Sequence, residues 1–352
     1  MTNLQKKDKM VKRRITIKEL AKELKISTST VSRALADKWD VNPETRKAVL
    51  ELAERWNYHP NPIFLSLKQQ QTLTIGVVVP EFITSFFPEV IIGIQCTLEA
   101  EGYSVLISQS NESYENELHN IKNLEARLVD GLIISLTKET VNTDYLQELL
   151  NRNMPLVLFN RVCDKIDVPK VIIDDYKWAF EAVEHLIKQG YKRIVHLAGP
   201  ENLELSQMRK KGFVDALKTH NMPMEPDQII PCGVMMEKGV IAAHRILEME
   251  NMPDAIFAIN DPVAIGAMKT LQKNGIRIPE DMGVVGFSES KMAMIVEPNL
   301  TSIEQPTYEM GKIAAELLIE QLKNKKDEAV LNKCITLNAR LNIRESSLRH
   351  HT

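Results

Sequence analysis

The hydrophobic pattern of this chain changes character once, near residue 72. Before that point, apolar residues recur at helical spacing in short segments, and Ile17, Leu20, Ala21 and Leu24 form the first such stripe. After it, β-branched runs such as 74–80 alternate with longer amphipathic segments. The pattern predicts a small all-α region followed by a large α/β region.

Three short helices are expected in the small region. The first covers Thr16–Leu24, the second starts at Ser27 as N-cap and reaches about Leu35, and the third starts at Asn42 as N-cap with a proline behind it. The residues expected to face inward are Val31 and Leu35 on the second helix and Val49, Leu52, Ala53 and Trp56 on the third. A fourth helix after Asn61 is too short to be stable alone. It is expected either to form in a dimer on DNA, with an apolar side chain in a minor-groove step, or to be a linker packed on the larger region.

The large region alternates strands and helices, which predicts parallel sheets with helices on both faces. Strands are expected at 74–80, 104–108, 131–135, 156–159, 171–173, 194–198, 228–231, 255–258 and 284–286. Helices are expected at 89–102, 115–127, 144–153, 176–190, 206–220, 239–248 and 261–274. Because the rhythm restarts near residue 171, two doubly wound α/β lobes in series are favoured over one large sheet.

Charge divides the chain at the same place. Residues 1–70 hold 15 Lys and Arg against 8 Asp and Glu, a formal charge of +7, whereas the whole chain carries −3 and residues 71–352 therefore carry −10. A cationic region on an acidic body is typical of a protein that contacts phosphates through one end. The absence of a secretory signal or of an apolar run of about 18 residues favours a cytoplasmic protein with no membrane partner. Four widely separated cysteines, at 96, 163, 232 and 334, are expected to be buried reduced thiols.

Two groups of polar residues are candidates for chemistry. Thr28, Ser29, Ser32 and Arg33 lie on the outer face of the second helix, where they suit base and phosphate contacts in a major groove; the alternative is an ordinary solvated face. Ligands of parallel sheets bind at the carboxyl ends of strands. The residues just past predicted strands are Ser135, Asn160, Arg161, Asp174, Asp175, Asn260, Asp261, Ser288 and Glu289, with Phe82, Phe86 and Phe87 after the first strand. Any single one of these could instead be a helix cap, a core residue or a solvated loop residue.

Catalytic motifs are not found. The sequence contains no nucleophile elbow, phosphate loop or HExxH metal motif, and His185 and His196 are expected to be structural. We therefore expect no catalytic residue, no metal and no cofactor.

The segments 17–35 (IKELAKELKISTSTVSRAL), 42–46 and 58–61, together with Leu67, resemble the DNA-binding head of the LacI/GalR family of bacterial transcription regulators, and the resemblance extends to about residue 347. It implies that Thr28, Ser29 and Arg33 read bases and that Leu67 is a minor-groove lever at the centre of a palindromic operator. The chain departs from the family at Phe64-Leu65, where Ala-Arg is usual. The full predicted DNA-binding set is Thr16, Ser27, Thr28, Ser29, Thr30, Ser32, Arg33, Asn42, Thr45, Tyr58, Asn61 and Leu67.

The same resemblance implies a periplasmic-binding-protein-like body with an effector site between its lobes. The predicted effector set is Phe82, Phe86, Ser135, Asn160, Arg209, Asn260, Asp261, Ser288 and Gln305. Ser288 and Asn160 replace an Asp found in some members, while Arg161 and Arg209 remain. This suggests a positive pocket for an acidic or phosphorylated sugar, unless Glu289 restores a carboxylate.

The resemblance implies a dimeric transcription regulator, most simply a repressor of carbohydrate genes, that binds double-stranded DNA and a sugar-like effector. The expected domains are a head at 1–60, a hinge at 61–72, a first lobe at 73–172 and 306–333, and a second lobe at 173–305 and 334–352. Three alternatives stay open: a catabolite-control-type regulator switched by a protein partner, a solute-binding module without DNA function, and an enzyme.

Overall fold

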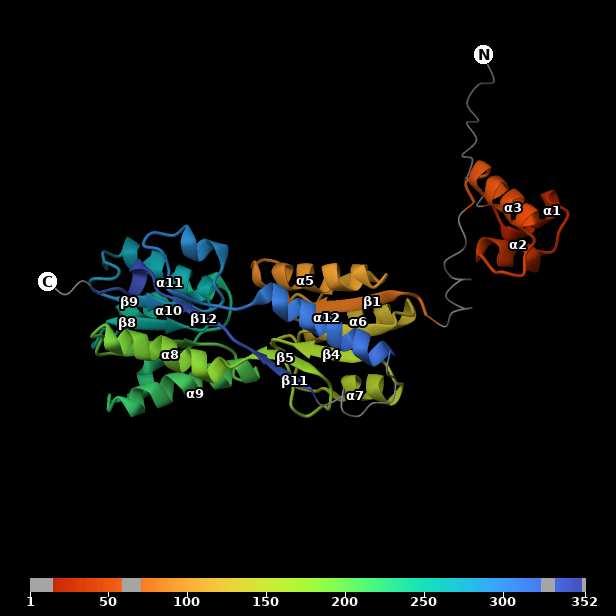
Figure 1. Ribbon diagram of the computed structural model, residues 1–352. Coiled ribbons are helices and arrows are strands. Elements are labelled where there is room, and N and C mark those ends of the chain that lie inside the picture. Colours follow the sequence, from red (N-terminus) through yellow and green to blue (C-terminus); the bar gives the residue numbers. More distant parts are fainter. Residues whose placement is uncertain (1–14, 59–70, 324–332, 350–352) are drawn as a thin grey trace, which may run out of the picture. The chain divides into compact units, whose positions relative to one another are not determined.

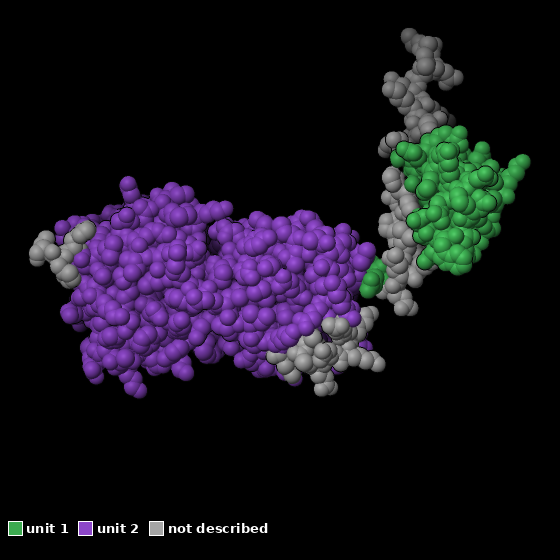
Figure 2. Space-filling model, in the orientation of Figure 1, with its two compact units in different colours: residues 1–72 green, residues 73–352 purple. Residues whose placement is uncertain are grey.

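The computed structural model describes residues 15–58, 71–323 and 333–349 (Figure 1). The chain divides into two compact units, Met1–Thr72 and Leu73–Thr352 (Figure 2). We call the described part of the first unit up to residue 58 the head, and that of the second unit the body. The predicted hinge residues Asn61 and Leu67 lie outside the described residues.

The head is a three-helix unit, as its apolar stripes predict. Its helices are α1 (Ile17–Glu23), α2 (Thr28–Leu35) and α3 (Pro43–Arg55). Leu20, Val31 and Val49 meet in its core with no exposed surface. Both expected N-caps are present, since the Ser27 hydroxyl accepts from the Thr30 amide at 3.0 Å and the Asn42 side chain accepts from the Glu44 amide at 2.8 Å.

The first lobe of the body is built on a parallel six-stranded sheet in the order β11-β5-β4-β3-β1-β2. Its strands are β1 (Thr74–Val79), β2 (Ser104–Gln109), β3 (Gly131–Ile134), β4 (Leu156–Phe159), β5 (Lys170–Ile173) and β11 (Cys334–Leu337). Its helices are α5 (Phe86–Ala100), α6 (Tyr114–Ala126), α7 (Asp144–Asn151) and α12 (Thr307–Lys323). Alternate residues of β1 serve opposite faces: Val77 packs in the cluster with α5 and α12, and Val78 in the cluster with α6 and α7.

The second lobe is built on a parallel four-stranded sheet in the order β7-β6-β8-β9. Its strands are β6 (Ile194–Ala198), β7 (Ile229–Pro231), β8 (Ala255–Ala258) and β9 (Gly283–Val285). Its helices are α8 (Asp175–Lys188), α9 (Glu204–Thr219), α10 (Met236–Leu247) and α11 (Asp261–Lys273), with 3-10 turns η1 (Pro226–Gln228), η2 (Lys291–Met294) and η3 (Glu345–Ser347). Helices α8 and α9 pack together on one face and α10 and α11 on the other, so the prediction of two doubly wound lobes is confirmed (Figure 1).

The path between the lobes corrects two expected boundaries. The first lobe was expected to end at residue 172, inside β5, but the whole strand belongs to the first sheet, where it pairs with β4 and β11. Residues 334–337 were expected in the second lobe, but as β11 they pair in parallel with β5 and extend the same sheet. The pairing covers the outer edge of β5, and β11 itself becomes the edge strand of the sheet. Strands β10 (Ser302–Glu304) and β12 (Arg340–Asn342) form an antiparallel ribbon where the chain passes between lobes.

The cysteines were expected to be reduced and buried, and the expectation of burial is wrong. All four cysteines are free thiols, but Cys96 and Cys334 are exposed, and Cys163 and Cys232 are half-buried. Cys96 lies on α5 and Cys334 on β11, the edge strand of the first sheet, where a small side chain meets solvent.

Candidate functional site

The outer surface of α2 gathers several predicted DNA-binding residues. Thr28, Ser29 and Arg33 are exposed and Ser32 is half-buried, while Val31 and Ala34 on the same helix face the head core. This arrangement follows from the 3.6-residue period, which separates the polar from the apolar positions. The helix therefore presents small hydroxyl side chains and one guanidinium outward.

Other members of the predicted DNA set have local structural partners. The Thr16 hydroxyl donates to Glu19 at 3.0 Å, and the Ser27 hydroxyl lies 2.7 Å from that of Ser29 and 2.8 Å from that of Thr30. Tyr58 packs against the head core, and burial raises the pKa of its hydroxyl. Asn42, an exposed helix cap, and Thr45, half-buried, lie at the start of α3 rather than on α2.

Arg33 has a partner that the sequence did not suggest. Its Nη2 forms an ion pair with Asp40, in the loop between α2 and α3. The Arg33 side chain is 54% exposed and the Asp40 side chain 22% exposed, so the carboxylate is the more enclosed member of the pair.

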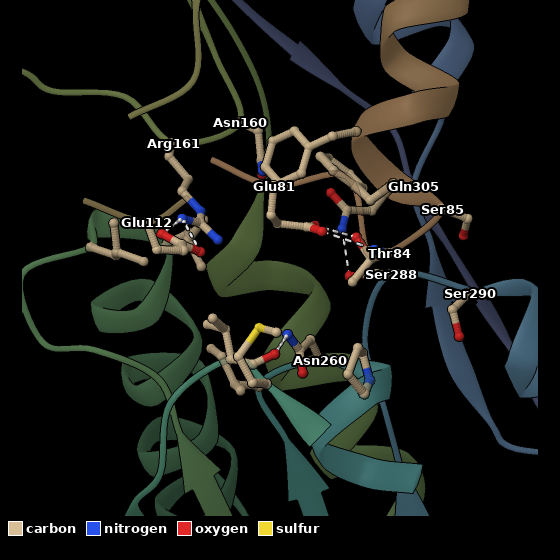
Figure 3. Close-up of a pocket in the computed structure, with 18 of the residues that line it drawn as sticks. Glu81, Thr84, Ser85, Glu112, Asn160, Arg161, Asn260, Ser288, Ser290 and Gln305 are labelled. Carbon is tan, nitrogen blue, oxygen red and sulfur yellow. Dashed lines mark hydrogen bonds and ion pairs between the residues drawn. The ribbon is translucent and has the colours of Figure 1, made fainter. Parts of the chain in front are cut away.

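A cavity opens in the body at the carboxyl ends of strands from both sheets. Its wall comprises Glu81, Thr84, Ser85, Phe86, Phe87, Glu112, Asn160 and Arg161 from the first lobe, and Leu203, Leu205, Arg209, Val234, Met235, Ile259, Asn260, Pro262, Ser288, Ser290 and Gln305 from the second lobe and the connecting ribbon. Figure 3 shows the labelled polar side chains around the hollow, with Arg161 and Glu112 on one side and Gln305 and Ser288 on another. The position agrees with the rule that parallel sheets bind ligands at strand carboxyl ends.

Arg161 is neutralised within the cavity wall. Its Nη1 donates to both carboxylate oxygens of Glu112, at 2.9 and 2.8 Å, and its guanidinium lies 5.7 Å from the Phe87 ring centroid. Burial acts to raise the pKa of Glu112, but the charge and hydrogen bonds of Arg161, with help from the Lys138 amide, hold that pKa below its ordinary value. Both side chains are under 10% exposed, so this is an ionised pair in a desolvated site.

Arg209 is held still more firmly. Its Nε donates to Asp175 at 2.8 Å, its Nη2 lies 2.7 Å from the same carboxylate, and its Nη1 donates to the Ile259 carbonyl at 2.5 Å. The guanidinium also stacks over Phe287, 3.5 Å from the ring centroid. The predicted positive pocket is therefore wrong, because both of its arginines already have a carboxylate partner.

The remaining polar wall offers hydrogen-bonding groups and one further carboxylate, that of Glu81. The Glu81 carboxylate is capped by the Thr84 hydroxyl and amide, and Gln305 Nε2 donates to the Ser288 hydroxyl at 3.3 Å (Figure 3). Gln305 Oε1 is buried without a hydrogen-bond partner. A buried acceptor of this kind suits a ligand hydroxyl.

The backbone is strained at two wall positions. Asn160 has φ 56° and Ser288 has φ 112°. Left-handed backbone is tolerated by asparagine, but it is costly for serine, and such residues cluster at functional sites.

Three predicted effector residues do not line the cavity. Phe82 is 41% exposed outside it, and Phe87 takes its place beside Phe86, with ring centroids 5.1 Å apart. Ser135 is fully buried behind the wall.

Asp261 is the third of these residues. It accepts from the Ser302 hydroxyl at 2.6 Å and the Ser290 amide at 2.5 Å, and burial raises its pKa to about 6. It therefore braces the loop that carries Ser288 instead of facing the ligand space.

Phe86, Asn160, Arg209, Asn260, Ser288 and Gln305 do line the cavity, as predicted. Sequence reasoning missed Glu81, Thr84, Ser85 and Glu112. Glu81 follows β1 and Glu112 follows β2, so the rule applied to later strands would have found both carboxylates. The apolar wall residues carry no such signal, because they are indistinguishable in sequence from core residues.

Two family models match the chain over most of its length. Residues 16–61 match the model of bacterial regulatory proteins of the lacI family, and residues 72–344 match the model of periplasmic binding proteins and the sugar binding domain of the LacI family. The chain belongs to the LacI family. It is therefore a DNA-binding transcriptional regulator with a helix-turn-helix head and a periplasmic-binding-protein-like effector domain.

Curated LacI-family relatives span almost the whole chain. Catabolite control protein A of Priestia megaterium is 32% identical over 95% of this chain and 99% of its own length. The HTH-type transcriptional repressor CytR of Escherichia coli (strain K12) is 33% identical over 88% of this chain and 90% of its own length. These relatives are transcriptional regulators.

Solved structures of the family share the fold. The transcriptional regulator CelR–cellobiose complex matches with a TM-score of 0.71 and 27% identity, over 95% of this chain and all of that one. The lac repressor dimer bound to operator and the anti-inducer ONPF matches with a TM-score of 0.82 over 96% of this chain and all of that one; at 24% identity it supports the fold alone.

Within residues 15–58, 71–323 and 333–349, no helix is long and apolar enough to cross a bilayer. In the same described ranges, no three His, Cys, Asp or Glu side chains are grouped to hold a metal ion.

Proposed function

We propose that this protein is a dimeric repressor of carbohydrate genes that binds a palindromic operator and is controlled by a neutral, polyhydroxylated effector. One head covers only a half-site, so a two-fold dimer matches a palindromic sequence. We further propose that the protein acts in the cytoplasm and catalyses no reaction.

The charge balance of the cavity carries the effector proposal. Its two arginines are matched by Glu112 in the wall and by Asp175 behind it, and Glu81 adds a further carboxylate. An anionic ligand would have no unpaired cation to meet, whereas hydroxyl groups can use Gln305 Oε1 and the other amide and hydroxyl groups. Phe86 and Phe87 supply aromatic surface. The cellobiose-bound regulator and a LacI-family regulator from Enterococcus faecium with bound ribose, 27% identical and with a TM-score of 0.69 over 79% of this chain and all of its own, support the same ligand class.

The effector would act by favouring one arrangement of the two lobes. It can shift DNA affinity only by as much as its own affinity differs between the two states. The wall supplies the structural basis for such a preference, because it draws residues from both lobes.

A thermal-shift panel on the full chain tests the proposal. Neutral sugars, nucleosides, acidic sugars and phosphorylated sugars would be compared, and a ligand at 100 times its dissociation constant should add about 2.7 kcal/mol of stability. We expect a neutral sugar or nucleoside to raise the unfolding midpoint.

The matched variant is Glu112→Gln, which leaves Arg161 unpaired and should shift the preference toward acidic ligands. Stabilisation of the wild type by anionic compounds alone would contradict the neutral-effector proposal. If no compound acts, switching by a protein partner becomes the better reading.

The DNA half of the proposal needs its own measurement. A duplex selected from a randomised library by the full chain should be palindromic, and its affinity should fall steeply with salt. Failure to select any duplex would contradict operator binding.

A further inference from the structure

Among the described residues of the head, Asp40 stands out because it occupies the one arginine of α2. The ion pair joins Arg33 Nη2 to Asp40 Oδ2. Arginine carries five N–H donors in a planar fork, and a guanine needs two of them. Nη2 carries two hydrogens, one on each two-donor edge of the fork, so an ion pair through one of them leaves the other edge of Arg33 available to a base.

The loop that carries Asp40 is fixed at several points. Arg46 forms an ion pair with Asp37 at 2.6 Å and donates to the Lys38 carbonyl at 2.6 Å. The Lys38 amide donates to the Arg33 carbonyl at 3.1 Å, which ties the loop back to α2. Val41, directly after Asp40, is buried in the head core. The backbone that carries the Asp40 carboxylate is therefore anchored to the rest of the head, and Arg33 is the longer and more exposed side chain of the pair.

We infer that Asp40 is a positioning residue that holds the Arg33 guanidinium for base contact and away from phosphate contact. A free arginine loses rotamer freedom when it binds a base, and a side chain already ordered by Asp40 loses less. The paired guanidinium also carries no net charge toward the backbone, so it adds little to sequence-independent binding. Both effects raise the ratio of specific to non-specific affinity. This inference rests on the proposed DNA-binding function of the head.

The test compares two duplexes and two charge-matched variants of the full chain. The first duplex is the one selected by the wild type from a randomised library, and the second is a shuffled duplex of the same composition. Asp40→Asn should weaken binding to the selected duplex by about 2- to 12-fold, the loss expected when one long side chain must be ordered on binding. Binding to the shuffled duplex should not weaken, and its log–log salt slope should steepen by up to about 0.9, because Arg33 becomes free to reach a phosphate.

Asp37→Asn is the matched control. It removes a carboxylate from the same loop, and its backbone, at φ 51°, suits asparagine. It breaks the pair with Arg46 instead of that with Arg33. We expect it to leave the specificity ratio unchanged. Equal changes from the two variants, or equal gains on both duplexes from Asp40→Asn, would show a net-charge effect and overturn the inference.

Two further measurements keep the result interpretable. In an Arg33→Ala background, Asp40→Asn should no longer change the specificity ratio; a persisting change would also overturn the inference. If Asp40→Asn unfolds the head, Asp40→Glu keeps the charge but moves the carboxylate, and it should still lower the ratio. A wild type that selects no duplex would instead refute the proposed function, so the two failures are distinguishable.

Discussion

The arginine pairs of the head and of the body use the same chemistry in opposite settings. Arg33 and Asp40 lie at the surface, with side chains 54% and 22% exposed, whereas Arg209 and Asp175 are 4% and 9% exposed. Arg209 commits Nε, Nη1 and Nη2 to the protein, but the Arg33 pair uses Nη2. A surface pair contributes about 0–1 kcal/mol to stability, while a buried charge left without its partner costs several. The head pair can therefore take part in recognition, and the body pair is part of the scaffold.

The largest expected effect is on the buried pair. Asp175→Ala should destabilise the body by about 3–5 kcal/mol, because the Arg209 charge would stay buried and unpaired. Urea unfolding of the full chain measures this, with Asp40→Ala as the surface counterpart, expected to cost under about 1 kcal/mol. Similar losses of unfolding free energy from both variants would contradict the distinction between a structural pair in the body and a surface pair in the head.

Buried ionisable groups also predict how the body responds to pH. Burial lowers the pKa of His196, stacked between Phe213 and Phe257, to about 4. The unfolded chain binds a proton more readily between about 6.5 and 4, so this histidine makes the body less stable as pH falls through that range, by up to about 3 kcal/mol. His196→Leu should flatten the slope of unfolding free energy against pH.

Asp261 supplies an opposite control for that slope. Its pKa is raised to about 6, so the folded state holds the extra proton, and its contribution is present at low pH and lost as pH rises toward 6. Asp261→Asn should therefore steepen the loss of stability on acidification. If the two variants changed the slope in the same direction, the burial argument would be wrong for one of them.

Recognition by Arg33 should produce the next largest effect. Arg33→Ala is expected to cost about 1–3 kcal/mol on the selected duplex and less on shuffled DNA, because two hydrogen bonds to a guanine would be lost. Fluorescence anisotropy with both duplexes measures this. Equal losses of affinity for the selected and the shuffled duplex would indicate that Arg33 contacts the phosphate backbone and not a base.

The smallest expected effect concerns the cavity wall. Gln305→Leu removes the buried acceptor Oε1 and should weaken effector binding by about 0.5–1.5 kcal/mol. Ser135→Ala, behind the wall, is the matched control and should leave effector affinity unchanged. Calorimetric titration with the effector found in the panel decides between them.

Much of the fold could be predicted because its signals are local. The α1–α3 stripes and caps depend on short-range periodicity, and the strand–helix alternation of the body is visible at the same scale. The assignment of β11 could not be predicted this way, since its partner β5 lies far away in sequence. The alternation of strands and helices locates each strand along the chain, but it does not identify the sheet that the strand joins.

The candidate site was predictable in position but not in charge. The rule of strand carboxyl ends placed Asn160, Asn260 and Ser288 in the wall. The partners of the arginines, Glu112, Asp175 and Asp40, could not be predicted, because ion pairing depends on side-chain geometry across separate elements. For this reason the sequence suggested a cationic pocket and an unoccupied Arg33.

Strands β11 and β12 follow each other in the chain but join different sheets, and this limits how the protein can be divided into fragments. The chain crosses between its lobes after β5, after β10 and again between β11 and β12. No single cut can therefore release either lobe as a continuous fragment, and a truncation before residue 334 would strip an edge strand from the first sheet as well as the tail that packs on the second lobe. An isolated lobe would have to be rebuilt by joining separate segments, with the antiparallel ribbon as the place where the joints are made.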